Sequence, residues 1–167
     1  MGGEANFKRT INQSYFNFVP TAPDDAYMVR MRRLTGQLPR AALDAYEIED
    51  PDCDPNSWMS CYSGYYIFKE PNRDMKLEVY REYLARMYEY ALARDGSGLL
   101  ARLEEPTLGN PIRVRRNGRL ISQDLVNSVR ERNAVLAALG ADDGMRFTVA
   151  ELGAGYGRLG YLLLKTT

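Results

Sequence analysis

Two long stretches of the chain carry apolar residues at three- and four-residue spacing, which is the pattern of an amphipathic helix. The first predicted helix runs from Asp74, a good N-cap, to Arg94, and Gly96 is placed to end it. The second begins after Ser122, whose hydroxyl can cap it, and stops at Gly140. The apolar positions are Leu77, Tyr80, Leu84, Met87, Tyr88 and Ala91 in the first helix, and Leu125, Val126, Val129, Val135, Leu136 and Leu139 in the second.

The pattern is weaker before these helices, because prolines divide the first 73 residues into short pieces. Asp24 or Asp25 is expected to cap a short helix that runs through Leu34 and ends near Gly36. A further short helix is expected over residues 39–46, opened by a proline.

Aromatic residues gather in two places. The segment from Trp58 to Phe68 could line a pocket, but such clusters more often belong to a core, and we favour the core. The first long helix carries four tyrosines. We expect Tyr80 and Tyr88 to pack in the core and Tyr83 and Tyr90 to be half exposed.

Residues 111–121 alternate between apolar and polar around Asn117-Gly118, the dipeptide best suited to a tight type I′ turn. A short hairpin is therefore predicted here. Its arginines are expected to form a solvated face, with anion binding as the alternative. They are Arg113, Arg115, Arg116 and Arg119.

The segment Met145–Leu152 reads as a short strand, and it is followed by the glycine-rich stretch 153–160 and the apolar run Tyr161–Leu164. A strand, a glycine-rich turn and a helix open a nucleotide-binding α/β unit. Glycines at 153 and 155 allow a sharp turn with no Cβ in the way of a ligand. The free N–H groups of the new helix would then face a polar part of a cofactor.

Two cofactor classes compete for this element. Gly155-x-Gly157-x-x-Gly160 satisfies the dinucleotide fingerprint of NAD- and FAD-binding oxidoreductases. Glu151-x-Gly153-x-Gly155-x-Gly157 instead resembles the first motif of class I S-adenosylmethionine-dependent methyltransferases. We favour the methyltransferase, because the acid stands two residues before the first glycine, and because more than 120 residues and a capped helix precede the strand.

The resemblance extends to bacterial sugar O-methyltransferases, through residues 118–128 and through the Gly-Tyr-Gly-Arg loop after Glu151, and so covers about the last 50 residues. It implies transfer of a methyl group from S-adenosylmethionine to a sugar hydroxyl. Two interpretations are open for the residues at the start of the second long helix: they reach this site, or they only cap the helix. These residues are Ser122, Gln123 and Asp124. The cofactor contacts that the resemblance implies are Glu151, Gly153, Ala154, Gly155, Tyr156, Gly157 and Arg158.

The fold class expected is α/β, with a mainly helical region over 1–121 that contains the hairpin, and the first βα unit of a Rossmann-like domain over 122–167. Ten residues follow Gly157, whereas the acid that holds the ribose is expected roughly 20 residues past the glycines. We therefore expect an N-terminal fragment with part of the donor site, inactive alone, and the sequence leaves the catalytic base and the oligomeric state open.

Composition narrows the partners. The 167 residues hold 22 basic and 22 acidic side chains and no histidine, so a nucleic-acid binder, His-ligated zinc and an imidazole base are not expected. Cys53 and Cys61 fit neither a metal site nor a disulfide framework. We expect a cytoplasmic protein with a small-molecule substrate, no membrane segment and no metal. A non-enzymatic helical interaction protein is the remaining alternative.

Overall fold

A computed structural model describes residues 20, 22–49, 72–106, 111–141, 145–146, 148–152 and 157–166 of the chain. These residues form six helices and a small three-stranded antiparallel sheet. The elements in chain order are α2 (Ala26–Thr35), α3 (Arg40–Asp44), β1 (Tyr46–Glu49), α5 (Arg73–Leu92), α6 (Leu99–Arg102), β2 (Arg113–Arg116), β3 (Arg119–Ile121), α7 (Gln123–Leu139) and α8 (Arg158–Thr166).

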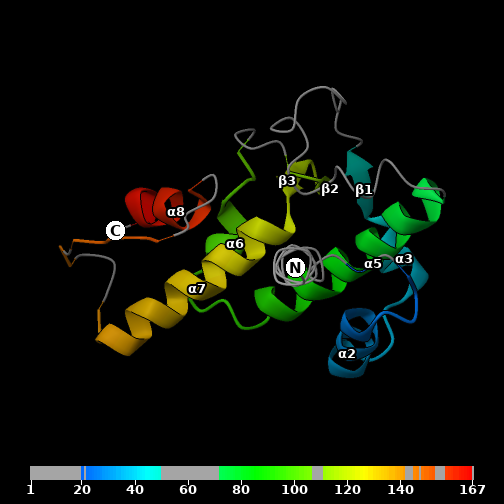
Figure 1. Cartoon of the computed structure of the whole chain (residues 1–167), viewed down its shortest axis with the longest axis horizontal. Coiled ribbons are helices and arrows are strands. Elements are labelled where there is room, and N and C mark those ends of the chain that lie inside the picture. The colour runs from blue at the N-terminus through cyan, green and yellow to red at the C-terminus, as the bar shows by residue number, and fades with distance from the viewer. Residues whose placement is uncertain are drawn as a thin grey trace, which may run out of the picture.

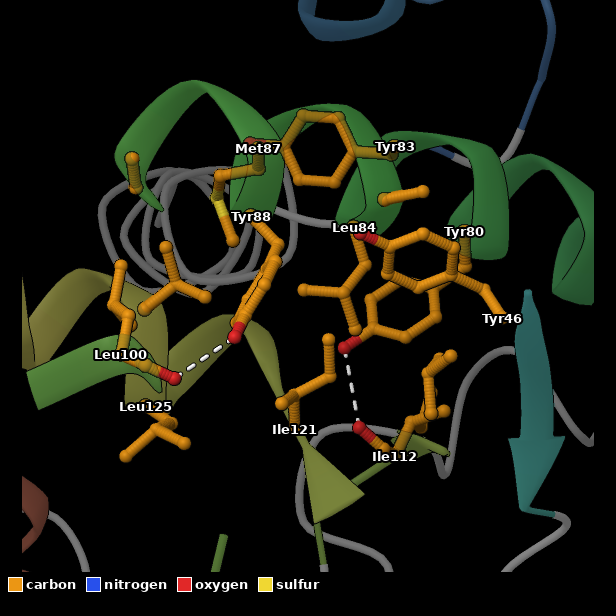
Figure 2. Close-up of a cluster of buried hydrophobic side chains, with 14 of the residues drawn as sticks. Tyr46, Tyr80, Tyr83, Leu84, Met87, Tyr88, Leu100, Ile112, Ile121 and Leu125 are labelled. Atoms are coloured by element: carbon orange, nitrogen blue, oxygen red, sulfur yellow. Dashed lines mark hydrogen bonds between the residues drawn. The ribbon is translucent and has the colours of Figure 1, made fainter. Parts of the chain in front are cut away.

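Helix α5 is the centre of the molecule and contacts α2, α3, β1, α6 and α7 (Figure 1). Tyr80 and Tyr88 lie in the core, as expected, and their hydroxyls donate to the carbonyls of Ile112 and Leu100 at 3.2 and 2.8 Å (Figure 2). Tyr83 is also buried, so its expected half exposure is wrong. The reason is that α2 and α7 cover α5 from different directions, which widens the buried face beyond one stripe.

The ends of α5 differ from those predicted. Asn72, in the left-handed region with φ 69°, precedes the first turn, and Asp74 lies inside that turn without being the cap. A carboxylate in the first turn is still stabilised by the positive end of the helix dipole. The helix ends at Leu92, with Ala93 as its C-cap, before the chain reaches Gly96.

The hairpin forms as predicted. Asn117 and Gly118 have φ angles of 50° and 79°, both positive as a type I′ turn requires. The strand β1 was not expected. The helix predicted over 39–46 ends at Asp44, and Tyr46 begins a strand instead. Strand β1 pairs antiparallel with β2, in the order β1-β2-β3.

The first helix, α2, has the predicted boundaries. The Asp25 side chain accepts a hydrogen bond from the backbone N–H of Tyr27 at 2.9 Å, and Gly36 ends the helix. Two arginines then tie α2 to α5. Arg32 of α2 contacts the carboxylate of Glu82 on α5 at 2.6 Å, and Arg86 of α5 donates to the carbonyl of Gly36, the C-cap of α2, at 2.8 Å. Helix α2 therefore docks through charge as well as through apolar contact.

Helix α7 also has the predicted caps, Ser122 and Gly140. Its N-terminal half packs on α5, and Leu125, Val126 and Val129 belong to the central core. Val135 and Leu139, expected on the apolar face, are exposed. Helix α8 packs on α7 at the end of the molecule away from α2 (Figure 1).

The strand predicted over 145–152 does not form in the residues described there. Met145, Val149 and Leu152 are exposed, and none of the described residues of this segment pairs with another strand. A parallel strand needs neighbours and cover on both faces, and the sheet present is antiparallel and built from earlier segments. The helix expected after the glycines does form, as α8. The described chain is thus a mixed helix and sheet structure.

Residues from both sides of the division expected at residue 121 contribute to the core. Helix α7 and Leu162 of α8 share one core with α5 and the hairpin. That division remains a prediction. Two further expectations, on the aromatic segment from Trp58 to Phe68 and on Cys53 and Cys61, lie outside the described residues.

Candidate functional site

The candidate site is the stretch from Glu151 to Arg158, where the resemblance places the cofactor contacts. Of the seven predicted contacts in it, the structure describes three, which are Glu151, Gly157 and Arg158. The predicted contacts Gly153, Ala154, Gly155 and Tyr156 lie outside the described residues.

Glu151 is exposed and lies beside the first turn of α8. A Cβ atom added to Gly160 would lie 3.4 Å from the Glu151 Oε2 atom. A carboxylate in this place is favoured by the positive end of the helix dipole. Its exposure also leaves it accessible to a cationic ligand group.

Gly157 begins α8. Its φ of 76° lies in the left-handed region, which a side chain makes costly, and its carbonyl accepts the first helical hydrogen bond, from the Tyr161 N–H at 2.8 Å. The turn from the glycine-rich stretch into the helix therefore depends on a glycine here.

Arg158 points inward. It is 5% exposed, and its Nη2 atom donates to Oε1 of Glu105, which is 2% exposed. The second carboxylate oxygen of Glu105 accepts from the hydroxyl of Ser122 at 2.7 Å. We call Glu105, Ser122 and Arg158 the Glu105 cluster. It joins three segments: the stretch after α6, the start of α7 and the start of α8.

Ser122 has two partners. Its oxygen accepts a hydrogen bond from the backbone N–H of Leu125 at 3.0 Å, which caps α7, while its hydroxyl proton goes to Glu105. Of the two interpretations of residues 122–124, the capped helix is confirmed for Ser122. The same side chain also connects α7, through Glu105, to the first residue of α8.

Burial dominates the electrostatics of the Glu105 cluster. It raises the pKa of the Glu105 carboxyl to about 7, and the nearby charge of Asp124 acts in the same direction. The hydrogen bond from Ser122 and the charge of Arg158 act against this rise. Burial also raises the pKa of the Tyr80 hydroxyl. Glu105 therefore has an ionisation near neutral pH in a sequence that has no histidine.

Glu105 is the residue that sequence reasoning missed. It stands beside Glu104 in an irregular stretch, and nothing in the local pattern separates the exposed glutamate from the buried one. The backbone N–H of Glu105 donates to the Leu120 carbonyl at 2.7 Å, which turns the side chain toward the core next to the hairpin. The buried glutamate is therefore determined by a backbone hydrogen bond between distant segments, which the periodicity of the sequence does not show.

The hairpin arginines do not form the solvated face that was expected. Arg113 and Arg115 contact Glu49 of β1 at 3.3 and 3.0 Å, and Arg116 contacts Glu89 of α5 at 2.7 Å. The fourth, Arg119, donates to two backbone carbonyls and to a tyrosine hydroxyl. The unexpected strand β1 supplies the acid for Arg113 and Arg115, and α5 supplies it for Arg116, so these side chains bind to partners within the protein.

Further features concern metal sites and membrane spans in the described ranges, and the similarity of the chain to known proteins. No three acidic, cysteine or histidine side chains within them gather closely enough to hold a metal ion. None of the helices described there has the length and apolar composition to cross a bilayer. No family model, curated protein or solved structure matches the chain.

Proposed function

We propose that this chain contributes the first cofactor-binding motif of an S-adenosylmethionine-dependent O-methyltransferase that acts on a sugar hydroxyl. The observation that carries the proposal is the motif Glu151-x-Gly153-x-Gly155-x-Gly157, followed directly by a helix. The exposed Glu151 carboxylate beside the first turn of that helix supports it, because the motif requires an acid free to meet a ligand.

Methyl transfer depends more on the alignment of donor and acceptor than on a reactive protein group. S-adenosylmethionine, when bound, supplies a methyl group on a sulfonium, and transfer to oxygen is an in-line displacement. Glu151 would hold the cationic amino group of the cofactor, and the backbone of the glycine-rich turn would approach the rest of the molecule closely. Holding donor and acceptor in line supplies most of the rate, together with removal of the hydroxyl proton.

Gly160 bears on the choice between the two cofactor classes. In the dinucleotide fingerprint, the third glycine lets the helix lie close to the strand. Among the described residues, the atom near a Cβ at Gly160 belongs to the Glu151 side chain, and no strand backbone lies within 4 Å. The described residues of 145–152 form no strand against which Gly160 could lie, so the feature that favours the methyltransferase motif over Gly155-x-Gly157-x-x-Gly160 is the acid Glu151.

The test is equilibrium dialysis of the natural gene product containing this chain with labelled S-adenosylmethionine, NAD and FAD in turn. We expect S-adenosylmethionine to bind and Glu151→Ala to weaken it about tenfold or more, because a charge-assisted hydrogen bond is lost. Glu47→Ala is the matched control, since Glu47 is exposed on β1. This control should bind like the wild type.

The other outcomes point elsewhere. Tight NAD or FAD binding that is indifferent to Glu151→Ala identifies an oxidoreductase. Binding of none of the three compounds by a folded gene product overturns the cofactor proposal and favours the helical interaction protein.

A further inference from the structure

We infer that Arg158 is a positioning residue, which holds Gly157 and the start of α8 in place through its ion pair with Glu105 and does not bind the cofactor itself. The inference rests on the proposed function, because it concerns the same donor site. It changes the role that the motif assigns to its arginine, and it adds Glu105 to the residues on which the site depends.

The geometry carries the inference. Arg158 is the first residue of α8 and directly follows Gly157, so the position of its guanidinium fixes where the turn ends. That guanidinium is buried against Glu105, while Glu151 of the same sequence motif is exposed. The acid and the arginine of one motif therefore face opposite environments, one open to a ligand and one joined to the core.

Glu105 is itself held from two sides. Its carboxylate accepts from Ser122 at the start of α7, and its backbone N–H donates to Leu120 at the end of the hairpin. Helix α7 and the hairpin belong to the central core. The ion pair with Arg158 thus connects the start of α8 directly to elements that form the packed core.

A requirement for stability does not explain this pair. Two buried charges lose their hydration, and replacing such a pair by apolar side chains is often neutral or stabilising. What the pair supplies is one defined orientation, because the planar guanidinium bonds to carboxylates in a fixed geometry. A buried pair that fixes the direction of a guanidinium, next to a predicted binding motif, is the arrangement a positioning residue requires.

The pair also makes the site sensitive to pH. Burial raises the pKa of Glu105 to about 7, so the carboxyl is largely neutral at pH 6 and largely ionised at pH 8. Ionisation completes the ion pair with Arg158. The other groups that face Glu105 are Ser122 and Asp124 on the α7 side, Arg113 on β2 and Tyr80 on α5.

The experiment measures S-adenosylmethionine affinity at pH 6, 7 and 8 for the natural gene product and for its Glu105→Gln variant. We expect the wild type to bind several-fold more tightly at pH 8 than at pH 6. The variant should bind at least fivefold more weakly than the wild type at pH 8 and show a flat profile. Arg158→Lys, which keeps the charge, should recover part of the affinity that Arg158→Met loses.

The matched control is Glu82→Gln. Glu82 accepts from Arg86, which is buried, and from Arg32 of α2, so these ion pairs lie where α5 meets α2. This variant also removes the carboxylate partner of a buried arginine, but it should leave both the affinity and its pH profile unchanged.

A direct cofactor contact by Arg158 makes the opposite prediction. In that case Glu105→Gln frees the guanidinium, and the affinity at pH 8 stays equal or improves, which would overturn the inference. If the wild type binds no S-adenosylmethionine at all, the proposed function fails by itself. Hydrogen exchange then decides the inference separately: the Tyr161 amide, bonded to Gly157, should exchange at least tenfold faster in Glu105→Gln. Unchanged exchange would refute the positioning role.

Discussion

The central core and the segment 145–152 both carry apolar side chains at regular positions, but they bury them very differently. Leu84 on α5 is 0% exposed and lies among the tyrosines and leucines of the core (Figure 2), whereas Leu152 is 100% exposed. The difference does not come from composition, since the segment Met145–Leu152 is as apolar as many buried strands. The difference in burial comes from the elements that pack against each segment.

An amphipathic helix needs one partner surface, and α5 has several among the described elements. A strand of the parallel type needs a neighbour at each edge and cover on both faces. The described elements put no strand beside residues 145–152. The comparison teaches that an apolar pattern predicts burial only when the rest of the sheet or bundle is present to complete it.

The largest expected effect tests this comparison directly. Leu84→Ala should lower the free energy of unfolding by about 2–5 kcal/mol, because it leaves a cavity in a fully packed site. Leu152→Ala removes the same atoms from an exposed side chain and should change it by less than about 0.5 kcal/mol. Urea unfolding of the two variants measures both. A cost for Leu152→Ala that approached the cost for Leu84→Ala would mean that residues 145–152 are buried in the folded protein.

A second, smaller effect concerns the Glu105 cluster, which joins the central core to the start of α8. The pKa of Glu105 is about 7 in the folded protein and near its ordinary value of 4.5 in the unfolded chain. Between these values the folded state binds more protons, so the stabilisation is fully present below pH 4.5 and is lost as pH rises through 7. Glu105→Gln should remove up to about 3 kcal/mol of this pH dependence.

The measurement is urea unfolding of the wild type and of Glu105→Gln at several pH values from 5 to 8. The sequence contains no histidine, so histidine ionisation does not contribute in this range. Equal slopes for the two proteins would show that Glu105 ionises at its ordinary pKa and that the charge of Arg158 outweighs the burial of the carboxyl.

The parts of the fold that could be predicted are those in which neighbouring residues determine the structure. The caps Asp25, Ser122 and Gly140 act within one turn, and Asn117-Gly118 fixes its hairpin by backbone preference. The strand β1 was missed because it spans four residues, too few to show a period, and is defined by pairing with β2 more than 60 residues later.

The candidate site divides in the same way. Glu151, Gly157 and Arg158 could be named from the sequence, because a glycine-rich turn between apolar segments is a local signal. The inward direction of Arg158 and the role of Glu105 could not, because they depend on contacts between segments about 50 residues apart. A local motif identifies the residues of a site, and tertiary packing decides which way each one faces.

The smallest expected effect tests where the central core ends. Gly140 closes α7 with a φ of 60°, and a Cβ placed there would meet no atom within 4 Å, so any cost of a side chain comes from the backbone conformation. Gly140→Ala should therefore lower the free energy of unfolding by about 1 kcal/mol.

Gly96→Ala is the matched control, because Gly96 also has open space around its Cβ position but no positive φ. That substitution should be neutral or stabilise by about 0.5 kcal/mol, through the lower entropy of the unfolded chain. Thermal unfolding of both variants measures the difference, and equal effects would show that α7 does not need the left-handed residue that separates the packed helix from the exposed segment after it.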